Sequence, residues 1–226
     1  MFFRRLILPL AILSRLSCLE FQESPYDNST PRGYFLYNLF DKSDGSASSS
    51  ASCGQSCRIF VTQTLSSNLG GVAGADALCN SDPRKVQDGR SYKAWVAQAG
   101  VRVASMTANA GDGQIDWIFR ANATYLRNDG VQIGTTGANA LLTFPLAVTA
   151  SGHSGPCPCP TSVTAIYTGM FSDWRTDTGI GNCGNWTSTA GSYNAGDPNI
   201  TGIGVIGGNG RSCSPGGVDG LLCVEQ

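Results

Sequence analysis

Nine cysteines in a chain of 226 residues constrain the fold of this sequence more than any other feature. They do not form the paired CxxC pattern of zinc sites, so they favour disulfide bonds and an oxidising compartment outside the cytoplasm. An odd number leaves one cysteine that needs a role of its own. Charged residues make up only 14% of the chain, which argues against a coiled coil, and its 29 glycines favour a loop-rich fold.

The first 17 residues are typical of a bacterial secretion signal, with a basic start and a short apolar stretch at residues 6–13. Leu16-Ser17-Cys18 follows and resembles the lipobox of lipoproteins, although Arg15 stands where an apolar residue is usual. We therefore predict that Cys18 is lipidated and anchors the chain in the cell envelope, at the surface of the outer membrane. The alternative is an ordinary signal peptide with an incidental cysteine. Lipidation would leave eight cysteines, an even set.

Charge and histidine content exclude several classes of function. Removal of residues 1–17 takes three arginines with it, which leaves twelve basic residues against sixteen acidic ones and a net charge of −4. Such a chain lacks the basic surface that binds nucleic acid, so no nucleic-acid partner is expected. The single histidine, His153, excludes a multi-histidine metal site. No apolar run reaches the roughly 18 residues that a membrane span needs.

Composition divides the chain into three parts: a signal peptide at residues 1–17, a lipidated cysteine and flexible tether at 18–56, and a folded domain at 57–226. The tether is expected from its Ser, Ala and Pro content. Its apolar segment, residues 33–40, is expected to pack on the domain or near the membrane surface rather than to act as a binding motif.

Local patterns in the folded part predict an α+β fold with few helices. A helix is expected at residues 74–80, and Asn128-Asp129-Gly130 predicts the turn of a β-hairpin. Most of the chain between Tyr167 and Leu221 is expected to be glycine-rich loop. Strands are expected at residues 58–64, 93–97, 163–167 and 221–224.

Four segments in chain order resemble a known family. They are residues 68–79 (NLGGVAGADALC), 92–95 (YKAW), 183–188 (CGNWTS) and 222–226 (LCVEQ). The series resembles the DUF1554 type of lipoprotein abundant in Leptospira, whose domain is similar to endostatin and, more distantly, to the C-type lectin-like fold. The resemblance covers residues 58–226 and implies a C-type lectin-like (endostatin-like) domain with long glycine-rich loops and disulfides.

The resemblance also implies a disulfide pattern. In the lectin-like fold the first helix is tied to the last strand and a second bridge closes the long loops, which implies Cys79–Cys223 and Cys183–Cys213. Two arrangements stay open for the others: cross-pairing of the N-terminal edge with the loop around Pro158, or two local bridges. We favour cross-pairing, because a local bridge across that single proline would be strained. The remaining cysteines are Cys53, Cys57, Cys157 and Cys159.

The sequence gives little support for a metal site or for catalysis. Asp197-Pro198-Asn199 resembles the triplet with which C-type lectins hold calcium, but the second calcium-binding segment is missing, so a turn is the simpler interpretation. The acids in the predicted loops have no nucleophile or base partner at a meaningful spacing. We expect no enzymatic activity, no cofactor and no bound metal.

The candidate binding surface is placed on the predicted loops, where a rigid scaffold usually carries function. Loop aromatics can anchor an interface, although packing in the core is the more common fate of tryptophan. Trp95 and Trp186 lie in the family-matching segments and are expected in the core. The candidate binding residues are Trp117, Trp174, Asp173, Asp197 and Asn199.

Relatives in the resembled family bind host extracellular-matrix proteins and complement regulators. The resemblance therefore implies a surface-exposed adhesin for partners such as laminin, fibronectin or a complement regulator. Two alternatives stay open: a carbohydrate-binding lectin-like module, and a structural envelope lipoprotein without a host ligand.

Overall fold

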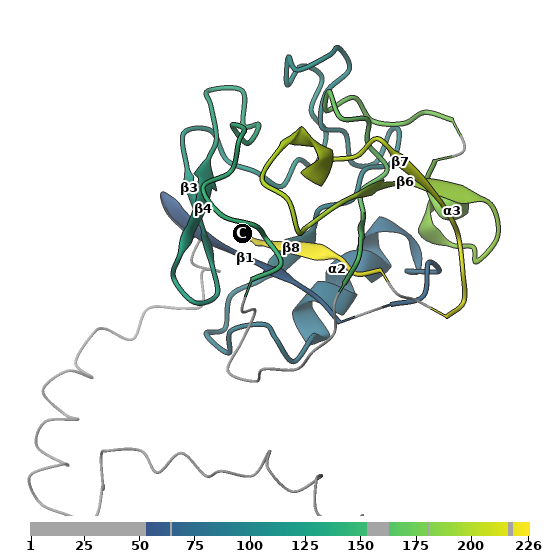
Figure 1. The fold of residues 1–226 in the computed structure, drawn as a ribbon, viewed down its shortest axis with the longest axis horizontal. Coiled ribbons are helices and arrows are strands. Elements are labelled where there is room, and N and C mark those ends of the chain that lie inside the picture. Colours follow the sequence, from purple (N-terminus) through teal and green to yellow (C-terminus); the bar gives the residue numbers. More distant parts are fainter. Residues whose placement is uncertain (1–52, 64, 153–162, 180, 217–218) are drawn as a thin grey trace, which may run out of the picture. The chain divides into compact units, whose positions relative to one another are not determined.

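A computed structural model describes residues 53–63, 65–152, 163–179, 181–216 and 219–226 of the chain. The described part is a mixed α+β fold with few helices, two sheets and three disulfides (Figure 1). Its elements are β1 (Ser56–Val61), α2 (Gly71–Ser81), β2 (Tyr92–Ala94), β3 (Thr124–Arg127), β4 (Gln132–Thr135), β5 (Ile166–Tyr167), α3 (Cys183–Trp186), β6 (Ser192–Gly196), the 3-10 helix η1 (Ile203–Val205), β7 (Asn209–Ser212) and β8 (Leu222–Glu225).

Several sequence predictions lie outside the described residues. These are the signal peptide, lipidation of Cys18, nearly all of the tether, His153, and the pairing of Cys157 and Cys159. Within the described ranges, no helix combines the length and the apolar character that crossing a bilayer requires.

The first sheet has the strand order β2-β8-β1-β3-β4. β1 pairs in parallel with β3 and antiparallel with β8, so the first and last strands of the described fold are neighbours. The amide of Cys53 extends this contact by donating to the carbonyl of Gln226 (3.1 Å). Cys53 is itself buried, so ordered structure reaches further toward the N-terminus than the predicted boundary at residue 57.

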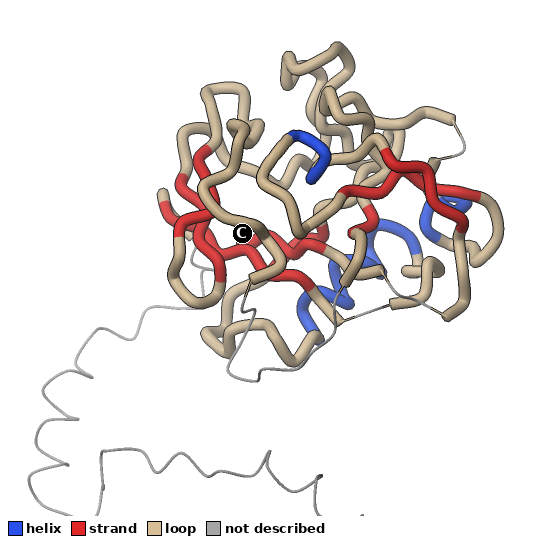
Figure 2. The backbone as a smooth tube through the Cα atoms, viewed as in Figure 1, coloured by secondary structure: helices blue, strands red, loops and turns tan. Residues whose placement is uncertain are grey.

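Both faces of the first sheet are buried at the central strands β1 and β8, whose side chains alternate between the two faces. On β1, Ile59 and Val61 face one hydrophobic cluster, while Phe60 between them faces the other. On β8, Val224 faces the same cluster as Ile59, and Cys223 faces the same cluster as Phe60. Helix α2 belongs to the Phe60 side. Figure 2 shows the longest loops on the other side of the fold, away from α2.

The predicted helix at residues 74–80 is confirmed and extends over Gly71–Ser81. It begins at Gly71, and the φ angles of Gly70 and Gly71, 77° and 78°, lie in the left-handed region that favours glycine. Its buried residues, Val72, Ala75 and Cys79, recur every three or four positions and form the stripe that packs on the sheet.

The predicted strands correspond to β1, β2, β5 and β8, and the predicted hairpin is β3–β4 with an irregularity beside Tyr125. The segment after Tyr167 differs from the prediction of loop. It contains α3 and a second sheet, in which β6 pairs with both β5 and β7. The sequence of β7, Asn-Gly-Arg-Ser, has no apolar alternation because most of its residues are exposed.

Three disulfides fix these elements. Cys79 is bonded to Cys223 and Cys183 to Cys213, the pairing that the resemblance implies. The first bridge ties α2 to β8.

The favoured cross-pairing is wrong for Cys53 and Cys57, which are bonded to each other. Gly54 between them has a φ of 63°, in the left-handed region, and this turn brings the two Cα atoms to 4.9 Å.

Candidate functional site

An aromatic cluster lies on the side of the first sheet opposite α2. Trp95 stacks on Trp174, with ring centroids 5.5 Å apart, and meets Phe119 edge-on at 5.1 Å. Trp117 packs edge-on against Trp174 at 6.0 Å. Trp95 is fully buried, as is Trp186 in the other cluster, which confirms their prediction as core. Aromatic pairs in these geometries stabilise one another, so the cluster is a rigid support for the adjacent loops.

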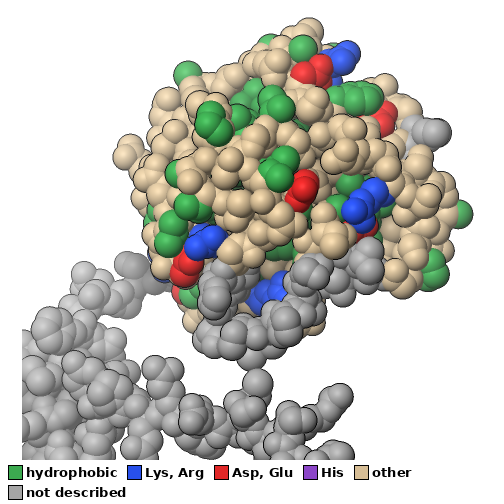
Figure 3. Space-filling model, in the orientation of Figure 1, with side chains coloured by type: hydrophobic (Ala, Val, Ile, Leu, Met, Phe, Trp, Pro, Cys, Tyr) green, Lys and Arg blue, Asp and Glu red, His purple; other side chains and the backbone are tan. Residues whose placement is uncertain are grey.

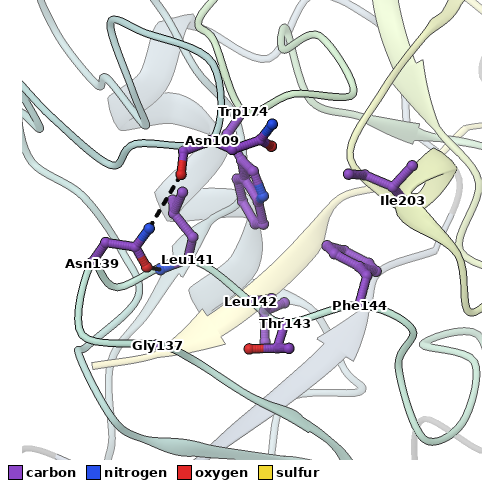
Figure 4. A pocket seen from close by; sticks show the side chains of 9 residues that line it. All are labelled: Asn109, Gly137, Asn139, Leu141, Leu142, Thr143, Phe144, Trp174 and Ile203. Carbon is purple, nitrogen blue, oxygen red and sulfur yellow. Dashed lines mark hydrogen bonds between the residues drawn. The ribbon is translucent and has the colours of Figure 1, made fainter.

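A cavity of about 420 Å³ adjoins this cluster (Figure 4). Trp174, Leu141 and Leu142 are its buried lining, and the half-buried ring of Phe144 and the exposed Ile203 are its apolar wall. Its lining comes from four segments that are far apart in the sequence and are called the pocket loops below. These are residues 105–114, 137–144, 171–176 and 201–206.

Hydrogen bonds tie the pocket loops to one another. The amide of Asn109 donates to the carbonyl of Asp173 (2.8 Å). The Asn139 carboxamide donates to the Asn109 carbonyl (3.3 Å, dashed in Figure 4). The indole N–H of Trp117 donates to the carbonyl of Ala140 (2.9 Å). These bonds hold the pocket in shape before any ligand arrives, which lowers the entropic cost of binding.

The pocket has a neutral, partly polar lining. None of the nine described residues that line it carries an ionisable group. Asn139 is engaged within the protein, since its carboxamide also accepts from the Leu141 amide (3.4 Å). The carboxamide of Asn109 and the hydroxyl of Thr143 are exposed and make no hydrogen bond to the described residues. These two groups are therefore available to a ligand.

A buried arginine, Arg102, lies just before the first pocket loop and joins the two flanks of that loop to the scaffold. Arg102 is fully buried, and its guanidinium donates to the carboxylates of Asp76 (2.7 and 2.8 Å) and Asp116 (2.6 Å) and to the Ala94 carbonyl (2.9 Å). Burial acts to lower the pKa of Arg102, but its hydrogen bonds to the two carboxylates outweigh burial and raise it. Lys93 also pairs with Asp116. Every charge in this cluster is compensated, which indicates a structural role.

Asp112 shapes the loop that presents Asn109. Its carboxylate accepts hydrogen bonds from the amides of Met106 (3.0 Å) and Thr107 (2.9 Å) and from the hydroxyls of Ser105 and Thr107 (both 3.0 Å). These bonds, the one from the Thr107 amide foremost, lower the pKa of Asp112 to about 2.

Replacing Asp112 by alanine is expected to loosen residues 105–113 without unfolding the sheets, because one carboxylate accepts four of the loop's hydrogen bonds. Amide protection factors at Met106 and Thr107 should fall about tenfold at pH 7. In the unaltered chain these protection factors should fall as the pH drops from about 4 toward 2. A carboxylate whose pKa is lowered by folding stabilises the fold at pH values above its ordinary pKa, and protonation removes this stabilisation.

Asp129→Ala is the matched control for this prediction. Asp129 accepts from the amide of Val131 in the β3–β4 turn, so its loss should leave protection at Met106 and Thr107 unchanged. Equal protection in Asp112→Ala and the unaltered chain would contradict the role given to Asp112.

The structure brings together some of the predicted binding residues and separates others. Trp174 lines the pocket, although only 2% of its surface is exposed, and Trp117 supports the pocket through Ala140. Asp173 holds the Asn109 amide through its carbonyl and pairs its side chain with Arg175 (2.8 Å).

Asp197 and Asn199 do not line the pocket. The Asp197 carboxylate accepts from the amide of Asn199 (2.8 Å), so the triplet forms the turn that was the simpler interpretation. Within the described ranges, no cluster of three or more His, Cys, Asp or Glu side chains is placed to hold a metal.

Sequence reasoning missed Asn109, Thr143, Phe144 and Ile203. Thr143 and Phe144 are neighbours in one pocket loop, whereas Asn109 lies in another and Ile203 lies on η1, so no local signal marks them as one site. Two pocket loops also precede Tyr167, whereas the glycine excess directed attention to the region after it.

A comparison with models of protein families gives a match. A family model described as "Protein of unknown function (DUF1554)" matches residues 62–201, which is more than half of the chain. The match spans the first three pocket loops and ends before Ile203. The search of curated proteins finds no match.

Proposed function

This chain belongs to the DUF1554 family, and on that premise we propose that it is a binding protein of the bacterial surface rather than an enzyme. In this proposal it is a lipoprotein of leptospiral type that is anchored in the outer membrane through Cys18. It displays a C-type lectin-like, endostatin-like domain that binds host extracellular-matrix or complement-regulatory proteins. The pocket between four loops, three of which are joined by hydrogen bonds, is the observation that carries the proposal.

The shape and chemistry of this pocket support binding rather than catalysis. Its volume of about 420 Å³ falls within the roughly 300–1,000 Å³ usual for ligand sites. Its described lining holds no acid, base or thiol, so no lining group could transfer a proton or activate the Thr143 hydroxyl as a nucleophile. Asp112 and Asp116 lie nearby, but each is engaged in structural hydrogen bonds.

The surface around η1 supports recognition that depends little on charge. Figure 3 shows this face with only scattered charged side chains among polar and hydrophobic ones. Ile203, on η1, is 44% exposed, and Phe171, in the neighbouring pocket loop, is 39% exposed. Partly exposed apolar side chains in a polar surround are common anchors at protein interfaces.

The arrangement of helix and strands supports the lectin-like part of the proposal. The first described helix is bridged to the last strand through Cys79–Cys223, and the last strand lies beside the first. The Cys183–Cys213 bridge closes the region that contains β6, η1 and β7.

A binding panel tests the proposal. The mature chain, residues 18–226, is expected to bind at least one of laminin, fibronectin, plasminogen and factor H. Binding should persist at 0.5 M salt, because no charged residue lines the pocket. Reduction of the disulfides should abolish it, since the pocket loops depend on the folded scaffold. Absence of binding to all four proteins would contradict the proposal, and so would equal binding by the reduced chain.

Protease treatment of intact cells separates an adhesin from a structural envelope lipoprotein. A surface adhesin should be cleaved while the outer membrane is intact. Protection of the domain until the membrane is permeabilised would contradict surface display.

A further inference from the structure

We propose that the pocket between residues 105–114, 137–144, 171–176 and 201–206 binds one neutral pyranose ring of a glycan without calcium. This inference rests on the proposed function, because it assumes that the domain is a binding module. It adds the chemical class of ligand that the pocket takes.

The lining selects against charged ligands. Its nine described residues include no ionisable group, and the adjacent Asp173 and Arg175 neutralise each other through an ion pair of 2.8 Å. The Arg175 guanidinium also lies over the ring of Phe171, 5.4 Å from its centroid. A sulfate, phosphate or carboxylate in this pocket would lose its hydration without gaining a counter-charge. The favoured ligand is therefore neutral.

The available polar groups select against a purely apolar ligand. The Asn109 carboxamide offers two donors and an acceptor, and the Thr143 hydroxyl offers one donor and an acceptor. Neither makes a hydrogen bond to the described part of the chain, so both are solvated in the free protein. An apolar side chain in the pocket would strip that water without replacing its hydrogen bonds. Hydroxyls of a sugar would replace them.

The apolar wall of the pocket suits the C–H faces of a sugar ring. Figure 4 shows Phe144 and Ile203 on one side of the cavity and Leu141 with Asn139 on the other. A pyranose presents C–H groups on its faces and hydroxyls at its edge, so it can pack on Phe144 while it bonds to Asn109 and Thr143. The cavity of about 420 Å³ has room for a ring together with ordered water.

Calcium has no donor set in this pocket. Calcium prefers six to eight oxygen ligands, several of them from carboxylates. No carboxylate lines the cavity, and the carboxylate of the nearby Asp112 is occupied by loop amides and hydroxyls. Binding should therefore be insensitive to chelators.

An array of neutral, sialylated and sulfated glycans tests the inference, with the mature chain applied with and without EDTA. We expect binding to neutral glycans that EDTA leaves unchanged. Asn109→Gly and Thr143→Val should each lower the affinity about tenfold, which corresponds to the loss of one or two hydrogen bonds. Glycine at position 109 keeps the left-handed backbone, whose φ is 58°.

Asn122→Gly is the matched control, because Asn122 is also exposed with a positive φ of 54° but does not line the cavity. It should bind like the unaltered chain. If a variant fails to fold, the unaltered chain is titrated with free methyl pyranosides instead. Their binding should change the tryptophan fluorescence, because Trp174 lines the pocket.

The outcomes separate this inference from the proposed function. Binding to a panel protein without binding to any neutral glycan or pyranoside overturns the inference and leaves the proposed function standing. Neutral-glycan binding that depends on EDTA, or that Asn109→Gly and Thr143→Val leave unchanged, also overturns it. Glycan binding that meets all expectations, in a chain that binds no panel protein, supports the inference and overturns the proposed partner class.

Discussion

Replacing both Cys79 and Cys223 by alanine is expected to lower the free energy of unfolding by about 5 kcal/mol. The two cysteines are 144 residues apart in sequence, and the bridge removes the freedom of that long loop from the unfolded chain. Both side chains are fully buried between α2 and β8, so alanine also leaves a small unfilled volume. Urea unfolding, followed by far-ultraviolet circular dichroism, measures the loss.

The Cys53–Cys57 bridge is the matched control, because it closes a loop of only four residues. Its removal is expected to cost about 2 kcal/mol in the same chain-entropy treatment. Equal losses for the two pairs would contradict the assignment of Cys79–Cys223 as the main covalent constraint of the fold.

Replacing Arg102 by methionine is expected to lower the free energy of unfolding by about 3 kcal/mol. Methionine keeps much of the side-chain volume but leaves Asp76 and Asp116 without the guanidinium between them. This loss is at the lower end of the range for removing one partner of a buried ion pair. The side chains of Asp76 and Asp116 are 22% and 37% exposed, so water can reach the two carboxylates. Urea unfolding measures it.

Arg175→Met is the control for this prediction, since Arg175 also pairs with an aspartate but is half exposed. Its loss should cost less than about 1 kcal/mol. Equal destabilisation by the two substitutions would show that burial adds nothing to the Arg102 cluster. That result would contradict its role in fixing the flanks of the first pocket loop to the scaffold.

The Arg102 cluster also gives a physical reason for the Gly-Ala-Asp segment of the family resemblance. Besides Arg102, the Asp76 carboxylate accepts the amide of Ala94 (2.8 Å). One side chain on α2 thus joins the helix to β2 and to Arg102, which lies just before the first pocket loop. Sequence alone marks Asp76 as part of a motif, but it does not identify Arg102, which is 26 positions away, as its partner.

The parts of the fold that sequence predicts are those with a strong local pattern. Helix α2 has an apolar stripe, β1 and β8 have β-branched and apolar residues, and the β3–β4 turn has an Asn-Asp-Gly signal. Strands β6 and β7 escape prediction because small and polar residues dominate both. Their pairing is fixed by contacts between distant segments, which no local window contains.

The candidate site was only partly predictable for the same reason. A tryptophan among polar loop residues drew attention to position 174, and the structure places Trp174 at the pocket. Its neighbours Asn109, Phe144 and Ile203 come from three other loops. Asp197 was selected for its resemblance to a calcium triplet, whereas its carboxylate only closes a local turn. A site built from four segments that lie far apart in the chain has no sequence signature.

Hydrogen exchange on the mature chain, with and without the panel protein that binds it most tightly, tests the central claim that the pocket loops form the binding surface. We predict that added protection concentrates in residues 105–114, 137–144, 171–176 and 201–206. Helix α2 and the Asp197–Asn199 turn should exchange as they do in the free chain. Protection confined to α2, to that turn or to the segment before Cys53, with the pocket loops unchanged, would contradict the claim.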